Sequence, residues 1–142
     1  MRRYLLDTTP LTAYLKGVPS AQELIAPWIT RQEAATSILV YGEVTEYNKS
    51  FPDVTRRQAQ LRRLLREVSP YVPTFAILER YAELRRRLRP PHGPGLIGDI
   101  DMLIAATALE HGLTLVTTDT DYQRVPDLKL TLLPRKMSSP NT

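Results

Sequence analysis

Short apolar runs, each separated from the next by segments with helical periodicity, constrain the fold of this chain more than any other feature. The runs that we interpret as strands are Arg3–Asp7, residues 34–40, Leu113–Thr117 and Leu128–Leu133, the last of them expected at an edge. Strands that alternate with helices are typical of an α/β domain with a mostly parallel central sheet.

Helices are expected between these strands. Ser20 and Thr74 are placed as N-caps, Gly112 as a C-terminal stop, and Glu43 in the first turn of its helix. The segment Pro90–Gly95 must be a loop, because proline and glycine disfavour the interior of helices and strands. The expected helices span residues 10–16, 20–29, 40–49, 54–68, 75–88 and 99–111.

The length of the chain favours a single domain. With 142 residues, 42% of them hydrophobic, it can bury one core of ordinary size. We assign residues 1–135 to this domain and residues 136–142 to a frayed tail. The N-terminus lacks a signal-peptide pattern and no run approaches the ~18 apolar residues of a membrane span, so we expect a cytoplasmic protein.

The residue types present narrow the chemistry. The sequence has no cysteine, which excludes disulfides, thiolate zinc sites and cysteine nucleophiles. The two histidines, His92 and His111, are too few for a histidine-rich metal site and disfavour a Ser–His mechanism. Carboxylates are therefore the main candidates for catalysis.

Positive charge is concentrated in the middle of the chain. The net charge is +4, yet the segment Arg56–Arg89 alone carries ten arginines against three glutamates. Such a segment indicates either a phosphate-binding face or an ordinary solvated helix surface, and arginines also suit a helix C-terminus. Taken alone, the charge slightly favours the solvated surface.

Acidic residues fall where the predicted strands end. Ligand sites of parallel sheets lie beyond the carboxyl ends of the strands. Four separate segments bring acids to this edge, and they carry Asp7, Glu43, Asp99 with Asp101, and Asp119 with Asp121. Because like charges raise one another's pKa and oppose folding, such a cluster favours a bound cation.

Oxygen-only ligands select a hard ion, and we expect Mg²⁺ or Mn²⁺ at this edge. Such a site hydrolyses phosphate esters, because the metal lowers the pKa of a bound water that a free carboxylate can orient or deprotonate. Each acid also has a structural interpretation when it is taken alone. These are helix caps for Asp7 and Asp99, a helix-dipole partner for Glu43, and turn residues for Asp119 and Asp121.

Four stretches in these regions resemble the motifs of PIN-domain proteins, in particular the VapC-type toxins of toxin–antitoxin pairs. They are Tyr4–Thr9 (YLLDTT), Ser37–Val44 (SILVYGEV), Ile97–Leu109 (IGDIDMLIAATAL) and Leu115–Tyr122 (LVTTDTDY). Thr9 stands where Asn or Ser is usual, and Asp101 matches the family aspartate before the LIAA run. The last stretch is one residue shorter than in many relatives, which leaves Asp119 and Asp121 as alternatives for the fourth acid.

The resemblance implies a three-layer α/β/α fold and Mg²⁺-dependent cleavage of single-stranded or looped RNA by the toxin of a type II pair. It implies a homodimer and a cognate antitoxin. The metal ligands that it implies are Asp7 and Asp101, with Glu43 as a ligand or water-orienting base, Asp119 as the fourth carboxylate, and Asp121 and Asp99 as further candidates. The arginines that would hold RNA phosphates are Arg56, Arg62, Arg63, Arg85, Arg86 and Arg87.

Two other hypotheses use the same fold class. A degenerate PIN-like domain that binds RNA or protein would explain Thr9 and the shortened last motif, although all four acids are present. A phosphoacceptor signalling domain also gathers acids beyond its strands. It needs a lysine at the end of a late strand, and this chain has the sequence Thr117-Thr118-Asp119 there.

Overall fold

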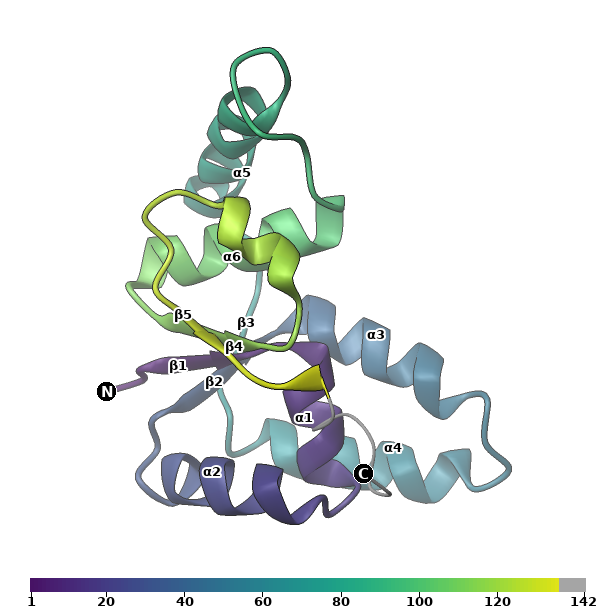
Figure 1. Cartoon of the computed structure of the whole chain (residues 1–142). Helices are drawn as coiled ribbons and strands as arrows, with labels where there is room; N and C mark the ends of the chain where they lie inside the picture. The colour runs from purple at the N-terminus through teal and green to yellow at the C-terminus, as the bar shows by residue number, and fades with distance from the viewer. Residues whose placement is uncertain (136–142) are drawn as a thin grey trace.

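A five-stranded sheet forms the middle layer of the molecule (Figure 1). The computed structural model describes residues 1–135, so the expected frayed tail, 136–142, lies outside the described residues. The strand order is β3-β2-β1-β4-β5, and every neighbouring pair is parallel. The strands are β1 (Tyr4–Leu6), β2 (Ala34–Ser37), β3 (Pro70–Tyr71), β4 (Thr114–Thr117) and β5 (Leu130–Leu132).

Helices cover both faces of the sheet, which confirms the predicted three-layer α/β/α fold. Helices α1, α2 and α4 lie on one face, and α5 and α6 lie on the other (Figure 1). The helices are α1 (Thr8–Leu15), α2 (Pro19–Thr30), α3 (Ile38–Asn48), α4 (Val54–Leu65), α5 (Phe75–Leu88) and α6 (Asp99–His111), with a 3₁₀ helix, η1 (Thr120–Arg124), after β4. None of the helices described between residues 1 and 135 is long and apolar enough to cross a membrane.

The core is built around the central strand. Leu5 and Leu6 of β1 point to opposite faces of the sheet, and both are fully buried. Helices on both faces of a parallel sheet explain why its strands are apolar runs without alternation. Helix α6 presents Ala105, Ala106 and Ala108 to the core, and such small side chains let a helix approach the sheet closely.

The helix ends show where the sequence predictions hold. Thr74 caps α5 as predicted, because its hydroxyl accepts a hydrogen bond from the backbone N–H of Ile77 at 3.2 Å. Gly112 ends α6 as predicted, with a φ of 64° that suits glycine. The prediction of Ser20 as an N-cap is wrong: α2 begins at Pro19 after Val18, since the fixed φ of proline suits the first helical position.

Helix α3 begins two residues earlier than predicted. The hydroxyl of Ser37 accepts a hydrogen bond from the backbone N–H of Leu39 at 3.1 Å and so caps the helix directly after β2. Glu43 therefore lies in the second turn, and its predicted place in the first turn is wrong. The helix-dipole interpretation of Glu43 loses its basis, because that effect is confined to the terminal turn.

Both edges of the sheet are short and are flanked by proline. The edge strand β3 has only two residues, of which Pro70 is one, and Pro73 follows it. At the other edge, Pro134 follows the three-residue strand β5 closely. Proline has no backbone N–H to donate to a neighbouring strand.

Burial predicts a contrast between the middle and the edge of the sheet. Leu5→Ala in β1 should lower the free energy of unfolding by roughly 2–5 kcal/mol, because a fully buried leucine leaves a cavity. Leu132→Ala in β5 is the matched control: its leucine is 37% exposed, so a much smaller loss is expected. Urea denaturation of both variants measures the contrast, and equal losses would contradict this description of the core.

Candidate active site

Asp7 stands at the seam between two neighbouring strands. It directly follows β1, and its backbone N–H donates to the carbonyl oxygen of Val116 in β4 at 3.0 Å. The hydroxyl of Thr117, at the end of β4, donates to Asp7 Oδ2 at 2.7 Å. Asp7 occupies the N-cap position of α1 but makes no side-chain capping bond, so capping does not explain its carboxylate.

Glu43 reaches the same edge from α3. The hydroxyl of Thr8, next in sequence to Asp7, donates to Glu43 Oε1 at 2.5 Å. This bond joins the first turn of α1 to the second turn of α3. The carboxylates of Glu43 and Asp7 are thereby brought to one end of the sheet, as the sequence analysis predicts for parallel strands.

Asp101 comes from the first turn of α6. The hydroxyl of Tyr122 donates to Asp101 Oδ1 at 3.0 Å, although Tyr122 itself is only 1% exposed. Asp119 follows β4 and caps η1, since its Oδ1 accepts from the backbone N–H of Asp121 at 2.9 Å. Its own N–H donates to the hydroxyl of Thr117 at 3.1 Å.

A hydroxyl group from another segment therefore holds each of three acids. The pairs are Thr117 with Asp7, Thr8 with Glu43, and Tyr122 with Asp101. None of these three hydroxyl residues is predicted from the sequence to lie in the site. The only sequence signal for them is that all three lie inside the quoted motifs, within three residues of a candidate acid.

Burial and mutual repulsion act on these carboxyl groups. The pKa of Asp7 is raised to about 6, chiefly by burial; the charges of Asp101 and Glu43 add to this rise, while the Thr117 hydrogen bond opposes it. Burial also raises the pKa of Asp101, with the charges of Asp119, Glu43 and Asp121 adding to it. The pKa of Tyr122 is raised, first by burial and then by Asp7 and Asp101. Five of the six predicted acids thus act on one another.

Asp99 is the acid that the structure places apart. Its Oδ1 accepts from the hydroxyl of Tyr81 at 3.1 Å and pairs with the guanidinium of Arg85, both on α5. Its side chain is 64% exposed. Asp99 therefore links α6 to α5 across the surface, and it does not contribute to the raised pKa of Asp7 or Asp101.

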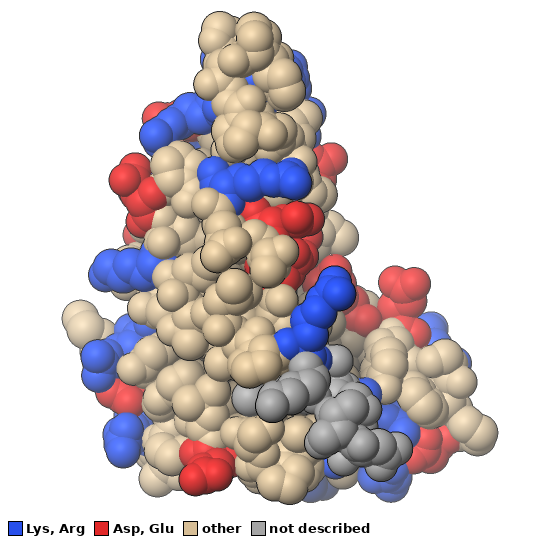
Figure 2. Space-filling view, in the orientation of Figure 1, with Lys and Arg blue, Asp and Glu red and all other residues tan. Residues whose placement is uncertain are grey.

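The predicted phosphate-binding arginines have different surroundings. Arg56 pairs with Asp53 and Arg85 with Asp99. Arg62 and Arg63 line a groove of about 600 Å³ along α4, where Arg62 is the main cause of a lowered pKa of Tyr41. Arg86 and Arg87 line a second pocket at the end of α5. Figure 2 shows a central group of acidic side chains with basic side chains above and below it.

The acid cluster fits a hard divalent cation by its chemistry. It offers carboxylate oxygens from Asp7, Glu43, Asp101 and Asp119, in a place where their charges oppose one another. Among residues 1–135, no group of three acidic or histidine side chains is arranged to coordinate a metal ion. The hydrogen bonds from the three hydroxyl groups hold the carboxylates instead.

Comparison with known proteins identifies the family. The sequence model of the PIN domain family matches residues 4–128. The chain belongs to the PIN domain family. A curated relative, Ribonuclease VapC19 from Mycobacterium tuberculosis, is 34% identical over 130 residues, which cover 88% of this chain and 96% of that protein.

Solved structures share this PIN fold. VapBC2 from Rickettsia felis, bound to a DNA fragment from its promoter, is 24% identical with a TM-score of 0.80, covering 92% of this chain and 98% of that one. A toxin–antitoxin complex from Klebsiella pneumoniae is 23% identical with a TM-score of 0.69, covering 90% and 95%. The resemblance drawn from four sequence motifs is therefore confirmed.

The raised pKa of Asp7 predicts how stability depends on pH. The penalty for its buried charge is absent below pH 3.8, grows as pH rises towards about 6, and is complete above that. A rise from 3.8 to about 6 corresponds to roughly 3 kcal/mol. Asp7→Asn should therefore be more stable than the wild type at pH 8, by up to about 3 kcal/mol, and the difference should vanish near pH 3.5.

Urea denaturation in EDTA across this pH range measures the effect of Asp7→Asn. The control is Glu23→Gln, which removes a charge from an exposed position on α2 and should leave the pH dependence unchanged. A variant less stable than the wild type at pH 8 would mean that the Asp7 charge serves the fold itself.

The hydroxyl of Tyr122 predicts a separate effect on metal binding. Tyr122→Phe keeps the buried ring but removes the hydrogen bond that holds Asp101. We expect about 10-fold weaker Mn²⁺ binding by calorimetry and a loss of about 1–2 kcal/mol in unfolding free energy. Tyr4→Phe is the control, because the hydroxyl of Tyr4 bonds to no residue in the described part of the chain; equal Mn²⁺ affinity of both variants would contradict the role of Tyr122.

Proposed function

We propose that this PIN-domain protein is a metal-dependent endoribonuclease that cleaves single-stranded or looped RNA, and that it acts as the toxin of a type II toxin–antitoxin pair. One observation carries the proposal: Asp7, Glu43 and Asp101 lie near enough to one another for their charges to interact. Burial chiefly raises the pKa of both aspartates, and the charge of Glu43 adds to the rise of each. The relative named Ribonuclease VapC19, aligned over 88% of this chain, supports it.

Asp7 and Asp101 are assigned as the main metal ligands, with Glu43 as a further ligand or as the base that orients water. Asp119 is assigned as the fourth carboxylate in preference to Asp121. Two observations support this choice. The backbone N–H of Asp119 donates to the hydroxyl of Thr117, which itself bonds to Asp7. The charge of Asp119 also raises the pKa of Asp101 more than the charge of Asp121 does.

A bound Mg²⁺ or Mn²⁺ would supply charge stabilisation to the phosphate group and a water of lowered pKa. The side chains of this protein hold the metal ligands in place and accept the proton. Thr117 and Tyr122 hold the carboxylates of Asp7 and Asp101 in place. Glu43, held by Thr8, is the carboxylate that can take a proton from water at the edge of the cluster.

RNA phosphates need positive charge, because the acid cluster itself repels them. Among residues 1–135, the guanidinium groups of Arg62, Arg63 and Arg86 pair with no acidic side chain, and they are the candidates to bind RNA directly. Arg56 and Arg85 already pair with Asp53 and Asp99, and Arg87 lies 3.8 Å from Asp127. Binding through these arginines should weaken as salt rises.

The proposal includes a cognate antitoxin, a second copy of the chain and a cytoplasmic location. The VapBC2 assembly and the toxin–antitoxin complex that share this fold support the antitoxin. The apolar side chains Val72, Phe75 and Leu78 at the start of α5 are exposed, Phe75 by 86%, and this patch suits a homodimer contact. The alternative is a catalytically degenerate PIN-like domain that binds RNA or a protein partner without cleaving RNA.

Cleavage of RNA tests the proposed function directly. Purified protein should cut total cellular RNA into discrete fragments with Mg²⁺ or Mn²⁺, and EDTA should abolish the cutting. Asp101→Asn should reduce cleavage to the EDTA level, since it removes a carboxylate that the other acids act upon. Electrophoresis and mapping of the fragment ends give the measurement.

The matched control for this test is Glu110→Gln, on the same helix, whose carboxylate pairs with Arg80 on the surface at 3.2 Å. It should cleave like the wild type. Metal-independent cleavage, or cleavage that survives Asp101→Asn, would refute the assignment. A folded, antitoxin-free protein that cleaves nothing with either metal would favour the degenerate binding domain.

A further inference from the structure

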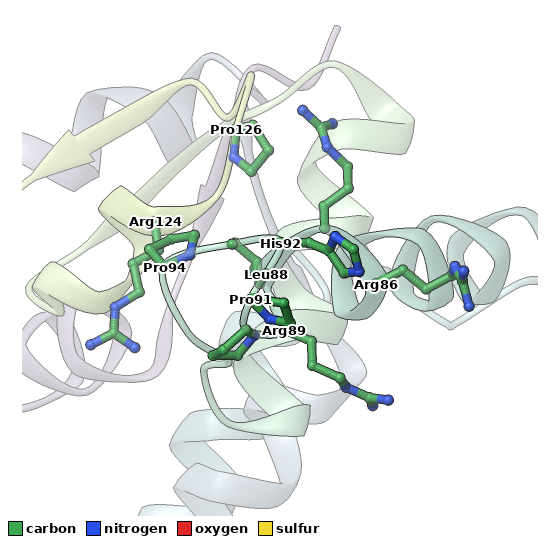
Figure 3. Close-up of a pocket in the computed structure, with 11 residues that line it drawn as sticks. Arg86, Leu88, Arg89, Pro91, His92, Pro94, Arg124 and Pro126 are labelled. Atoms are coloured by element: carbon green, nitrogen blue, oxygen red, sulfur yellow. The ribbon is translucent and has the colours of Figure 1, made fainter.

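A basic pocket of about 710 Å³ lies at the end of α5, outside the acid cluster. Residues 86–94 line it together with Arg124 and Pro126, and we name it the arginine–proline pocket. It contains four arginines and His92 but no acidic residue. Figure 3 shows Arg124 beside Pro94 on one side of the pocket and Arg86 and Arg89 on the other.

The loop of this pocket is held in one shape by its own backbone. The N–H groups of His92 and Gly93 donate to the carbonyl oxygen of Arg89 at 3.0 and 3.1 Å, and the N–H of Gly95 donates to Leu88 at 2.8 Å. The chain turns so tightly that a Cβ at Gly93 would lie 2.0 Å from the carbonyl oxygen of Arg87. The pocket is therefore formed before any ligand arrives.

Two of the four arginines of the pocket have no acidic partner among the described residues. Within the described residues, the guanidinium groups of Arg86 and Arg89 make no hydrogen bond or ion pair. Arg87 and Arg124 form long ion pairs at the surface, with Asp127 at 3.8 Å and Asp121 at 3.7 Å. The guanidinium groups shown in Figure 3 are spread around the rim rather than aimed at one point, which suits a chain of phosphates better than one small anion.

The helix η1 connects the pocket to the acid cluster. Asp121 stands near its start, Tyr122 in its middle bonds to Asp101, and Arg124 at its end lines the pocket. Arg124 is fixed there, because it donates to the carbonyl oxygen of Leu96 at 3.1 Å. Three residues of a 3₁₀ helix rise only about 6 Å, so Asp121, beside the acids, and Arg124, at the pocket, lie close together along η1.

We propose that the arginine–proline pocket binds an unpaired nucleotide of the RNA strand, next to the segment that lies at the acid cluster. The arginines hold the phosphates, and the imidazole ring of His92 stacks on the base beside the apolar proline rings. This inference rests on the proposed ribonuclease function and adds a site to it. It accounts for a preference for single-stranded or looped RNA, because a base must leave its stack to enter the pocket.

The test measures binding without cleavage. A fluorescent single-stranded RNA on the order of ten nucleotides long is titrated with protein in EDTA, and anisotropy gives the affinity at several salt concentrations. A duplex of the same sequence is titrated in parallel. Arg89→Ala and His92→Ala are compared with the wild type, and circular dichroism checks that these exposed substitutions leave the fold intact.

Arg89→Ala should weaken single-strand binding several-fold and reduce the salt dependence by about one phosphate contact, a slope change of roughly 0.7. His92→Ala should weaken single-strand binding about tenfold but leave duplex binding unchanged, because only an unpaired base can stack. The matched control is Arg31→Ala, an exposed arginine beyond the end of α2 that pairs loosely with Glu33; it should bind like the wild type.

Two results would overturn the proposed nucleotide site. One is that Arg89→Ala and His92→Ala bind single-stranded RNA as tightly as Arg31→Ala does. The other is that both variants lose affinity for a copurified antitoxin but not for RNA. Metal-dependent cleavage by the wild type is assayed beside the titrations. Cleavage by the wild type together with unchanged RNA binding by the pocket variants would refute the pocket alone. Weakened RNA binding by these variants in a protein that cleaves nothing would favour the degenerate RNA-binding domain and would leave the pocket as its nucleotide site.

Discussion

The buried hydrogen bond from Thr117 to Asp7 is the interaction on which the rest of the site depends. It joins residues 110 positions apart, at the ends of two strands that lie side by side only because β4 pairs with β1. A carboxylate that is 7% exposed needs such a partner, since an unpaired buried charge is strongly unfavourable. Thr117 also receives the N–H of Asp119, so one hydroxyl organises two of the proposed acids.

Much of this arrangement follows from the sequence, because it depends on local rules. Apolar runs mark the buried strands, Thr74 marks the start of α5, and the rule for parallel sheets places Asp7 and Asp101 at one edge. The contacts made across the fold do not follow. No local pattern pairs Tyr122 with Asp101 or turns Asp99 towards Arg85. The apolar run from Ala34 to Val40 also hides the start of α3, because the run does not mark Ser37 as the cap that ends β2.

Acidic and basic side chains, which are interspersed along the sequence, lie in separate regions of the folded protein. The acids gather where the strands end, while arginines of the central segment line two other surfaces, one along α4 and one at the end of α5. Some of these arginines serve the fold, as Arg85 does by joining α5 to α6 through Asp99. Others face solvent without an acidic partner among the described residues. The helix η1 is where the two regions meet, with Tyr122 facing the acids and Arg124 facing the pocket.

The short, proline-flanked edges of the sheet limit how this protein can assemble. A partner that adds a strand needs a row of free backbone donors and acceptors along an edge. Pro70 removes a donor from β3, Pro73 interrupts the chain after it, and β5 offers three residues before Pro134. Strand addition is thus disfavoured at both edges, and an antitoxin or a second copy would have to recognise helix surfaces and side chains. The short, proline-flanked edge strands also disfavour aggregation of the monomer through edge-to-edge strand pairing.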